Sequence, residues 1–167
     1  MAEPVRRLRA DEGELLRRVR LRALAESPRA FGATLADEAA LPDEEWQRRA
    51  AAGAAGDEQI VFLALDGVGA PLGMAGGRWF DEHREVVALW GMWLEPTARG
   101  TGLAASLVQA VSDWAAARGA RRLRLGVVSD GAGAIRFYER LGFVREGDER
   151  PMRRDPGQLW FEMFRDV

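Results

Sequence analysis

The sequence predicts an α/β protein in which a mixed, mostly antiparallel sheet of about seven strands is flanked by four helices. Apolar runs of strand length alternate with amphipathic helical stretches, and three of the strands follow one another as a meander. The chain has 167 residues and 47% hydrophobic side chains, which is enough for one full core. We therefore expect residues 1–167 to form a single domain with helices on both faces of the sheet.

The first third of the chain predicts one strand and two helices. Residues 5–9 have the pattern of a short strand, and a helix begins at Asp11. Pro28 ends this helix, and a second one begins within residues 41–46, where a proline precedes acidic residues. The apolar residues of the first helix recur at helical spacing: Leu15, Leu16, Val19, Ala23 and Leu24. We expect the small, glycine-rich residues 50–57 to form a loose connection.

The middle of the chain predicts a three-stranded meander. Residues 60–65, 72–80 and 86–94 are apolar runs, and short polar or glycine-containing turns separate them. Gly91 lies inside the third of these strands, where glycine is unusual. It indicates a β-bulge or a close approach of the backbone to another group.

The last third of the chain predicts helix, strand, helix and two strands. An amphipathic helix follows Gly102, and its apolar face carries Leu103, Leu107, Val111, Trp114 and Ala115. The remaining elements are a strand at 123–128, a short helix at 134–141, a strand that begins at 142–144, and a final strand at 159–164.

The composition excludes several classes of function. A formal net charge of −2 gives no electrostatic reason to expect a nucleic-acid partner. No apolar run reaches the roughly 18 residues of a membrane helix, so we expect no membrane partner and a cytoplasmic location. The chain has 0 cysteines, which excludes disulfides, thiolate metal sites and an acyl-cysteine intermediate. It also lacks lysine, which excludes a lysine base and the phosphate lysine of a P-loop.

The strongest local signal is the turn Arg99-Gly100-Thr101-Gly102-Leu103-Ala104, which joins a buried strand to an amphipathic helix. The first backbone N–H groups of a helix have no partner inside it, and the helix dipole places partial positive charge there. The two glycines let a phosphate approach the main chain, and Arg99 adds a planar donor fork. The turn therefore predicts a binding site for a ligand that carries a pyrophosphate.

Two other interpretations of this turn remain open at this point. Gly100-x-Gly102-x-x-Ala105 fits the dinucleotide fingerprint, and Asp130 follows a later strand at a suitable distance for a ribose contact. Against it, residues 95–99 separate the strand from the first glycine, whereas that fingerprint follows its strand almost directly. The turn can also be a glycine-rich helix start that binds no ligand.

Three segments together resemble the GNAT acetyltransferase superfamily. Arg99-x-x-Gly102-x-Ala104 is similar to its acyl-CoA-binding motif, and Ala134-x-x-x-Tyr138-x-x-x-Gly142-Phe143 is similar to its C-terminal helix and strand. Residues 92–96 resemble the end of its fourth strand, and residues 21–24 with 28–31 resemble the helices that border its acceptor site. The resemblance covers essentially the whole chain, and the two motifs in order are more specific than either alone.

The resemblance implies an acyl donor, acetyl-CoA, and assigns residues to it. The pyrophosphate would bind the backbone of Arg99, Gly100, Thr101, Gly102, Leu103 and Ala104. A bulge at Gly91 would separate the fourth strand from the fifth, and the pantetheine arm would pair with the main chain of Met92, Trp93 and Leu94. Tyr138 would protonate the departing thiolate, and Arg136 is a candidate for the 3′-phosphate of CoA.

The general base and the acceptor site are less well defined by the sequence. Many relatives use a glutamate on the fourth strand, but residues 86–88 are apolar here, so Glu85 is the nearest candidate. Glu38 or a water-mediated route is equally open. Phe31 and Glu38 are the candidates for the acceptor site. Gly131 stands where many members carry an asparagine that holds the cofactor arm, and Ser129 or Asp130 are possible replacements.

These assignments predict an enzyme that transfers an acetyl group from acetyl-CoA to a primary amine of a small molecule or peptide by direct attack in a ternary complex. No metal is needed, and the family suggests a homodimer. The alternatives are a non-catalytic acyl-CoA-binding or regulatory module and, with less support, a dinucleotide-dependent enzyme.

Overall fold

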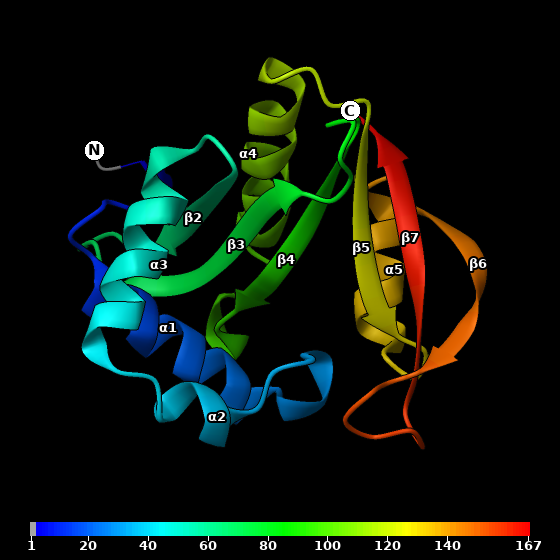
Figure 1. The fold of residues 1–167 in the computed structure, drawn as a ribbon, viewed down its shortest axis with the longest axis horizontal. Coiled ribbons are helices and arrows are strands. Elements are labelled where there is room, and N and C mark those ends of the chain that lie inside the picture. Colours follow the sequence, from blue (N-terminus) through cyan, green and yellow to red (C-terminus); the bar gives the residue numbers. More distant parts are fainter. Residues whose placement is uncertain (1–2) are drawn as a thin grey trace.

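The structure is a computed structural model that describes residues 3–167, so residues 1 and 2 of the predicted domain lie outside it. Its strands are β1 (Val5–Arg7), β2 (Gln59–Leu65), β3 (Pro71–Trp79), β4 (Val86–Leu94), β5 (Arg122–Val128), β6 (Val144–Pro151) and β7 (Leu159–Asp166). They form one seven-stranded sheet in the order β1-β2-β3-β4-β5-β7-β6 (Figure 1). Only β4 and β5 pair in parallel, which confirms the predicted mixed, mostly antiparallel sheet.

The described residues form five α-helices, one more than the sequence predicted: α1 (Gly13–Glu26), α2 (Leu35–Ala39), α3 (Asp43–Ala55), α4 (Leu103–Ala117) and α5 (Ala132–Arg140). The additional helix, α2, has only 5 residues, and the hydroxyl of Thr34 caps it by accepting the N–H of Asp37 at 3.0 Å. None of the helices within residues 3–167 has the length and apolar character needed to cross a membrane.

The loose connection predicted at residues 50–57 is wrong for most of its length. The alanine-rich run continues α3 to Ala55, because alanine has the highest intrinsic helix propensity. The helix ends at Gly56, whose φ of 72° lies in the left-handed region that glycine adopts without strain.

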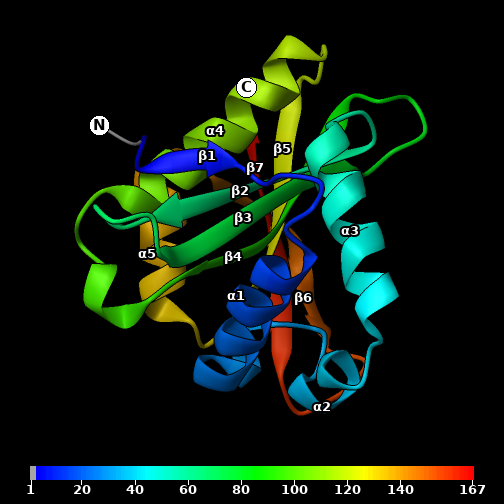
Figure 2. The ribbon, with the colours of Figure 1, turned by 90° about the vertical axis from the view of Figure 1, so that its left-hand side faces the viewer.

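Helices cover both faces of the sheet, as predicted. Figure 2 shows α1, α2 and α3 on one face and α4 with α5 on the other. The apolar face of α4 packs on β2, β3 and β4, and Leu107 and Val111 are fully buried there. On the opposite face, Leu16 of α1 and Trp46 of α3 lie in a second buried cluster against β2 and β3. The sheet is therefore buried on both sides along its first four strands.

The sheet divides in the middle, and Gly91 lies at the point of division. β4 pairs with β5 only through Val86–Ala88, and beyond that the two strands diverge (Figure 1). The pairing of β3 with β4 shifts between Met74 and Gly76, because β4 has an extra residue there. Gly91 has a φ of 63°, which confirms the predicted bulge. The last residues of β4 consequently have a strand neighbour on the β3 side only.

Gly76 is the basis of a stability prediction. A Cβ at this position would lie 2.2–2.6 Å from three atoms of the Trp90 indole, and a stiff ring in a packed sheet cannot move aside easily. Gly76→Ala should lower the free energy of unfolding by about 1–3 kcal/mol in urea titrations. Gly67→Ala is the control, because a Cβ there meets no atom within 4 Å. Equal stability of the two variants would contradict this packing.

Candidate active site

Two cavities reach the divided part of the sheet from opposite faces. The first, here the α4–α5 cavity, has a volume of about 660 Å³. Its lining comprises Ser27, Ala30, Phe31, Met92, Trp93, Leu94, Arg99, Gly100, Gly102, Ala104, Ala105, Gly133, Ala134, Phe137, Tyr138, Arg140 and Leu141. The second, here the α1–α3 cavity, has a volume of about 560 Å³ and reaches Trp90 and Gly91. Both cavities include Ala30 and Phe31, so these residues lie where the two meet.

The turn before α4 presents a row of backbone donors to the first cavity. Gly100 and Gly102 have φ values of 79° and 88°, which fold the chain tightly before the helix begins at Leu103. Within residues 3–167, the N–H groups of residues 100–105 donate to no backbone or side-chain acceptor. The first turn of α4 also has no acidic residue. The positive end of the helix dipole therefore remains available to an anion.

Arg99 is held in place by a carboxylate from α1. Its Nη2 lies 2.9 Å from Glu26, and its Nε donates to the carbonyl oxygen of Leu94 at 3.1 Å. Glu26 also accepts the indole N–H of Trp93 at 2.9 Å and the hydroxyl of Ser27. The Ser27 and Trp93 hydrogen bonds hold the pKa of the Glu26 carboxyl below its usual value, and Arg99 adds to this shift. One carboxylate thus joins α1 to β4 and to the turn.

Tyr138 lies in the wall of the α4–α5 cavity, on α5. Its side chain is buried, and its ring packs edge-on against Phe143 at a centroid distance of 5.7 Å. Burial raises the pKa of the phenol, so the hydroxyl stays protonated at neutral pH. No hydrogen-bond partner of this hydroxyl occurs among residues 3–167, which leaves its proton available to a group in the cavity.

Glu38 lies in the α1–α3 cavity, but arginines already surround its carboxylate. Arg20 donates to it from Nε at 3.0 Å, and Arg49 lies 3.5 Å away. The guanidinium of Arg20 also lies over the ring of Phe31, 5.0 Å from its centroid. The predicted role of Glu38 in receiving a cationic amine stays a prediction, since its charge is compensated within the chain.

The loop that carries Phe31 is fastened by the connection between β6 and β7. Arg154 donates to the carbonyl oxygen of Phe31 at 2.9 Å, and the buried amide of Gln158 donates to that of Arg29 at 3.0 Å. Arg29 in turn forms an ion pair with Asp130 at 2.9 Å. The residues that separate the two cavities are therefore fixed from the far end of the sequence.

Several predicted site residues do not line a cavity. Thr101 and Leu103 contribute only backbone at the turn, and the Thr101 hydroxyl donates to the carbonyl oxygen of Ala98. Arg136 is exposed on α5 outside the α4–α5 cavity, whereas Arg140 lines it. Arg136 and Arg140 lie one helical turn apart on α5, and the sequence pattern does not show which of them lines the cavity.

The structure places Glu85, the predicted general base, away from both cavities, because of its position before β4. It precedes the strand at the end where β4 still pairs with β5, and Arg121 lies 3.6 Å from its carboxylate. Six residues of extended chain separate it from Gly91, which corresponds to about 20 Å. Glu85 lines neither cavity. The role of Glu85 as a general base stays a prediction, and this position gives it no support.

Gly131 stands where many family members carry an asparagine, and two neighbouring residues, Ser129 and Asp130, are the possible replacements. Asp130 is occupied by Arg29, whereas the buried hydroxyl of Ser129 has no hydrogen-bond partner within residues 3–167. The hydroxyl of Ser129, rather than the carboxylate of Asp130, is therefore free to replace the asparagine. Residues 3–167 contain no cluster of three or more His, Asp or Glu residues that could hold a metal ion.

A comparison with protein families gives a match over residues 21–143 to the acetyltransferase (GNAT) family. The chain belongs to the GNAT acetyltransferase family. Among curated relatives, a mycothiol acetyltransferase from Actinosynnema mirum is 33% identical over 130 residues, which cover 77% of this chain and 39% of that protein. Matches to the curated relatives span 29–39% of their length.

Solved structures of family members have the same fold. An acetyltransferase of the GNAT family from Streptococcus pneumoniae superposes with a TM-score of 0.82 at 23% identity, over 98% of each chain. A phosphinothricin acetyltransferase from Sinorhizobium meliloti, in complex with acetyl-CoA, gives a TM-score of 0.75 at 22% identity, over 100% of this chain and 89% of its own. The predicted family and fold are confirmed.

The Glu26 network predicts a pH-dependent contribution to stability. Because the pKa of Glu26 is lowered in the folded state, its full stabilisation is present above the unfolded pKa of about 4.3 and is lost progressively as pH falls from there through the lower pKa of the folded state. Glu26→Gln should lower the free energy of unfolding at pH 7 by about 1 kcal/mol, the size of one net hydrogen bond. The difference should shrink as pH falls below the unfolded pKa and disappear only once pH has passed below the lowered pKa of Glu26 in the folded state.

Glu139→Gln is the control for this measurement, because Glu139 is exposed on α5 and has no ion pair within residues 3–167. Urea titrations of the two variants at several pH values give the comparison. The loss of unfolding free energy in Glu26→Gln could persist unchanged at pH 3, or Glu139→Gln could show the same loss. Either result would show that the carboxylate of Glu26 does not hold the turn.

Proposed function

We propose that residues 1–167 act as one acetyltransferase domain that transfers the acetyl group of acetyl-CoA to a primary amine of a small molecule or peptide. The observation that carries the proposal is the meeting of two cavities on adjacent residues of β4. The α1–α3 cavity reaches Gly91, and the α4–α5 cavity begins at Met92. A donor in one cavity and an acceptor in the other would meet at this junction without leaving the protein.

The α4–α5 cavity fits the CoA part of the donor. Its floor includes the free N–H groups of residues 100–105, which suit a diphosphate, and its apolar wall suits a pantetheine arm. The main chain of Met92–Leu94 has no strand on the β5 side, so an extended arm can pair with it as an added strand. Arg140 is our candidate for a further phosphate contact, in place of Arg136.

The proposed reaction is a direct transfer. The lone pair of the amine nitrogen attacks the thioester carbonyl carbon, a C–N bond forms, and the C–S bond breaks. A main-chain N–H of the bulged segment stabilises the negative charge on the carbonyl oxygen. Tyr138 gives its proton to the leaving sulfur, which becomes the thiol of CoA, and the proton that the nitrogen loses returns through water to the tyrosinate, so that the phenol is restored. The products are an amide and CoA.

The source of the general base follows from the carboxylates near the junction. Among the described residues, Glu38 is the one carboxylate in the lining of the α1–α3 cavity, and its two oxygens already face Arg20 and Arg49. We therefore propose that the amine loses its proton to water in the open cavity rather than to a protein carboxylate.

A cytoplasmic location and a homodimer are further proposals. A chain without cysteine suits a reducing compartment, and β6 is an exposed edge strand.

A charge placed at the start of α4 tests the diphosphate site. Ala104→Asp should stabilise the helix by about 0.3–1 kcal/mol, because a negative charge complements its dipole. The same charge should weaken the binding of CoA at least about tenfold in calorimetric titrations, because it repels the diphosphate. Ala116→Asp, at the exposed other end of α4, is the control and should leave CoA affinity unchanged. Equal CoA affinities in both variants would contradict the site.

Tyr138→Phe tests the chemistry while keeping the ring that packs on Phe143. Release of free thiol from acetyl-CoA, measured with a panel of primary amines, should be saturable for the natural chain. The variant should lose about a hundredfold in kcat, a typical contribution of a general acid, with unchanged KM for acetyl-CoA. Thermal stabilisation by CoA without thiol release for any amine would instead support a non-catalytic CoA-binding module.

A further inference from the structure

The α1–α3 cavity is lined by positive charge to a degree that the acceptor assignment alone does not explain. Five arginines line it against one carboxylate, and they come from α1, α3, β3 and β5: Arg20, Arg48, Arg49, Arg78 and Arg124. Glu38 compensates Arg20 and Arg49, Glu45 compensates Arg48 and Arg49, and Glu162 compensates Arg124. A cationic amine without other charges would enter this cavity against the field of the guanidinium groups.

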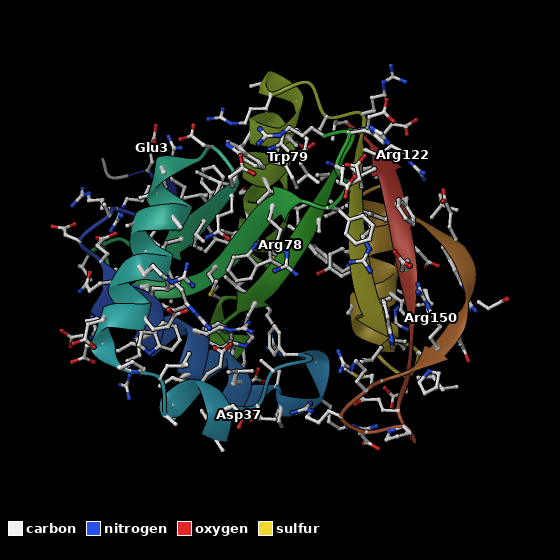
Figure 3. All side chains as sticks on the ribbon, in the orientation of Figure 1. Glu3, Asp37, Arg78, Trp79, Arg122 and Arg150 are labelled. Atoms are coloured by element: carbon white, nitrogen blue, oxygen red, sulfur yellow. The ribbon has the colours of Figure 1, made fainter. Side chains whose placement is uncertain are left out.

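Arg78 is the arginine of this set that keeps a free guanidinium. No ion pair or side-chain hydrogen bond engages it within residues 3–167. It extends from β3, opposite Ala88 of β4. Figure 3 shows it near the middle of the molecule on β3, and it lines the α1–α3 cavity. A planar fork of N–H donors in this position suits a carboxylate or phosphonate oxygen.

Three buried N–H donors in the same lining have no acceptor within the described residues. They are Nη1 of Arg20 and the indole nitrogens of Trp46 and Trp90. Trp46 is 2% exposed, so its free donor is part of the protein interior. Buried donors are almost always paired, because leaving one unpaired forfeits its hydrogen bonds to water. These three atoms have almost no accessible surface, so they lie behind the wall of the cavity and are not contact points for a bound molecule.

The position of Arg20 brings its charge to the reacting end of the site. Its Nη1 lies 3.6 Å from the point where a Cβ of Gly91 would be, and Gly91 is the bulge where the two cavities meet. Glu38 fixes the other side of the same guanidinium at 3.0 Å. The positive charge of Arg20 is thus fixed close to the junction of the two cavities.

We propose that the acceptor is a small amine that also carries an anionic oxygen group, a carboxylate or a phosphonate, which binds to Arg78 within the arginine-rich lining of the α1–α3 cavity. This inference rests on the proposed acetyl transfer and names its acceptor class. Glu38 then serves to fix the charge of Arg20 rather than to receive the amine. The amine of such a molecule faces β4, and its anionic group faces the arginines of the α1–α3 cavity.

Matched pairs of amines test this proposal. L-amino acids, the corresponding α-amides, aminoalkylphosphonates and spermidine are offered with acetyl-CoA, and thiol release is followed. The proposal predicts that kcat/KM is at least about tenfold higher for one of the two anionic series than for the amides and spermidine, the size of one charge-assisted hydrogen bond. The acid and phosphonate series distinguish the two kinds of anion. Equal or better turnover of amides and spermidine would overturn the proposal.

Arg78→Gln provides the matched variant, with Arg18→Gln as its control. Arg18 lies on α1, is exposed and lines neither cavity, so both changes remove one surface guanidinium. Arg78→Gln should raise KM for the anionic acceptor several-fold and reduce its advantage over the amide, with KM for acetyl-CoA unchanged. Identical kinetics of Arg78→Gln and Arg18→Gln would overturn the proposal.

A binding measurement separates this inference from the proposed transfer. Calorimetry with protein saturated with CoA compares the acids, phosphonates and amides without any turnover. Tighter binding of an anionic series supports the anion site even if no thiol is released, and indifference to the charge overturns it. Failure of CoA itself to bind would instead overturn the proposed function.

Discussion

The end of pairing between β4 and β5 is the constraint on which the rest of this site depends. Three residues of each strand pair, and Gly91 then adopts a left-handed conformation that inserts an extra residue and turns β4 away. The division leaves main chain without a strand neighbour and lets the two cavities meet through the sheet. A continuous sheet would have sealed both, because every backbone group of β4 would be paired.

The two sides of this opening differ in charge, and the difference assigns them to different ligands. On the α4–α5 side, neutral backbone N–H groups and a helix dipole face the cavity, while Glu26 holds Arg99 beside them. On the α1–α3 side the donors are guanidinium groups, and Glu38 orients Arg20. Each side thus uses one carboxylate to fix an arginine, because the long side chain of arginine is otherwise free to adopt many rotamers.

Much of this organisation could be predicted from the sequence, because local patterns specify it. The meander, the bulge at Gly91, the glycine turn and the family follow from residues close together in the chain. Predictions that required three-dimensional placement were weaker. Glu85 is near in sequence but lies away from both cavities, and the arginines of the α1–α3 cavity come from four separate elements. No local pattern reveals that such distant residues line one space, since packing of the helices on the sheet decides it.

The central claim is that the free amides of residues 100–105 bind the diphosphate of CoA. Backbone amide chemical shifts, followed by NMR as CoA is added, test it most directly. The account predicts that the amides of Gly100 and Gly102 and the first residues of α4 shift most, and that pantetheine, which lacks the diphosphate, leaves them nearly unchanged. Saturating CoA that leaves these amides unmoved while other amides respond would contradict it.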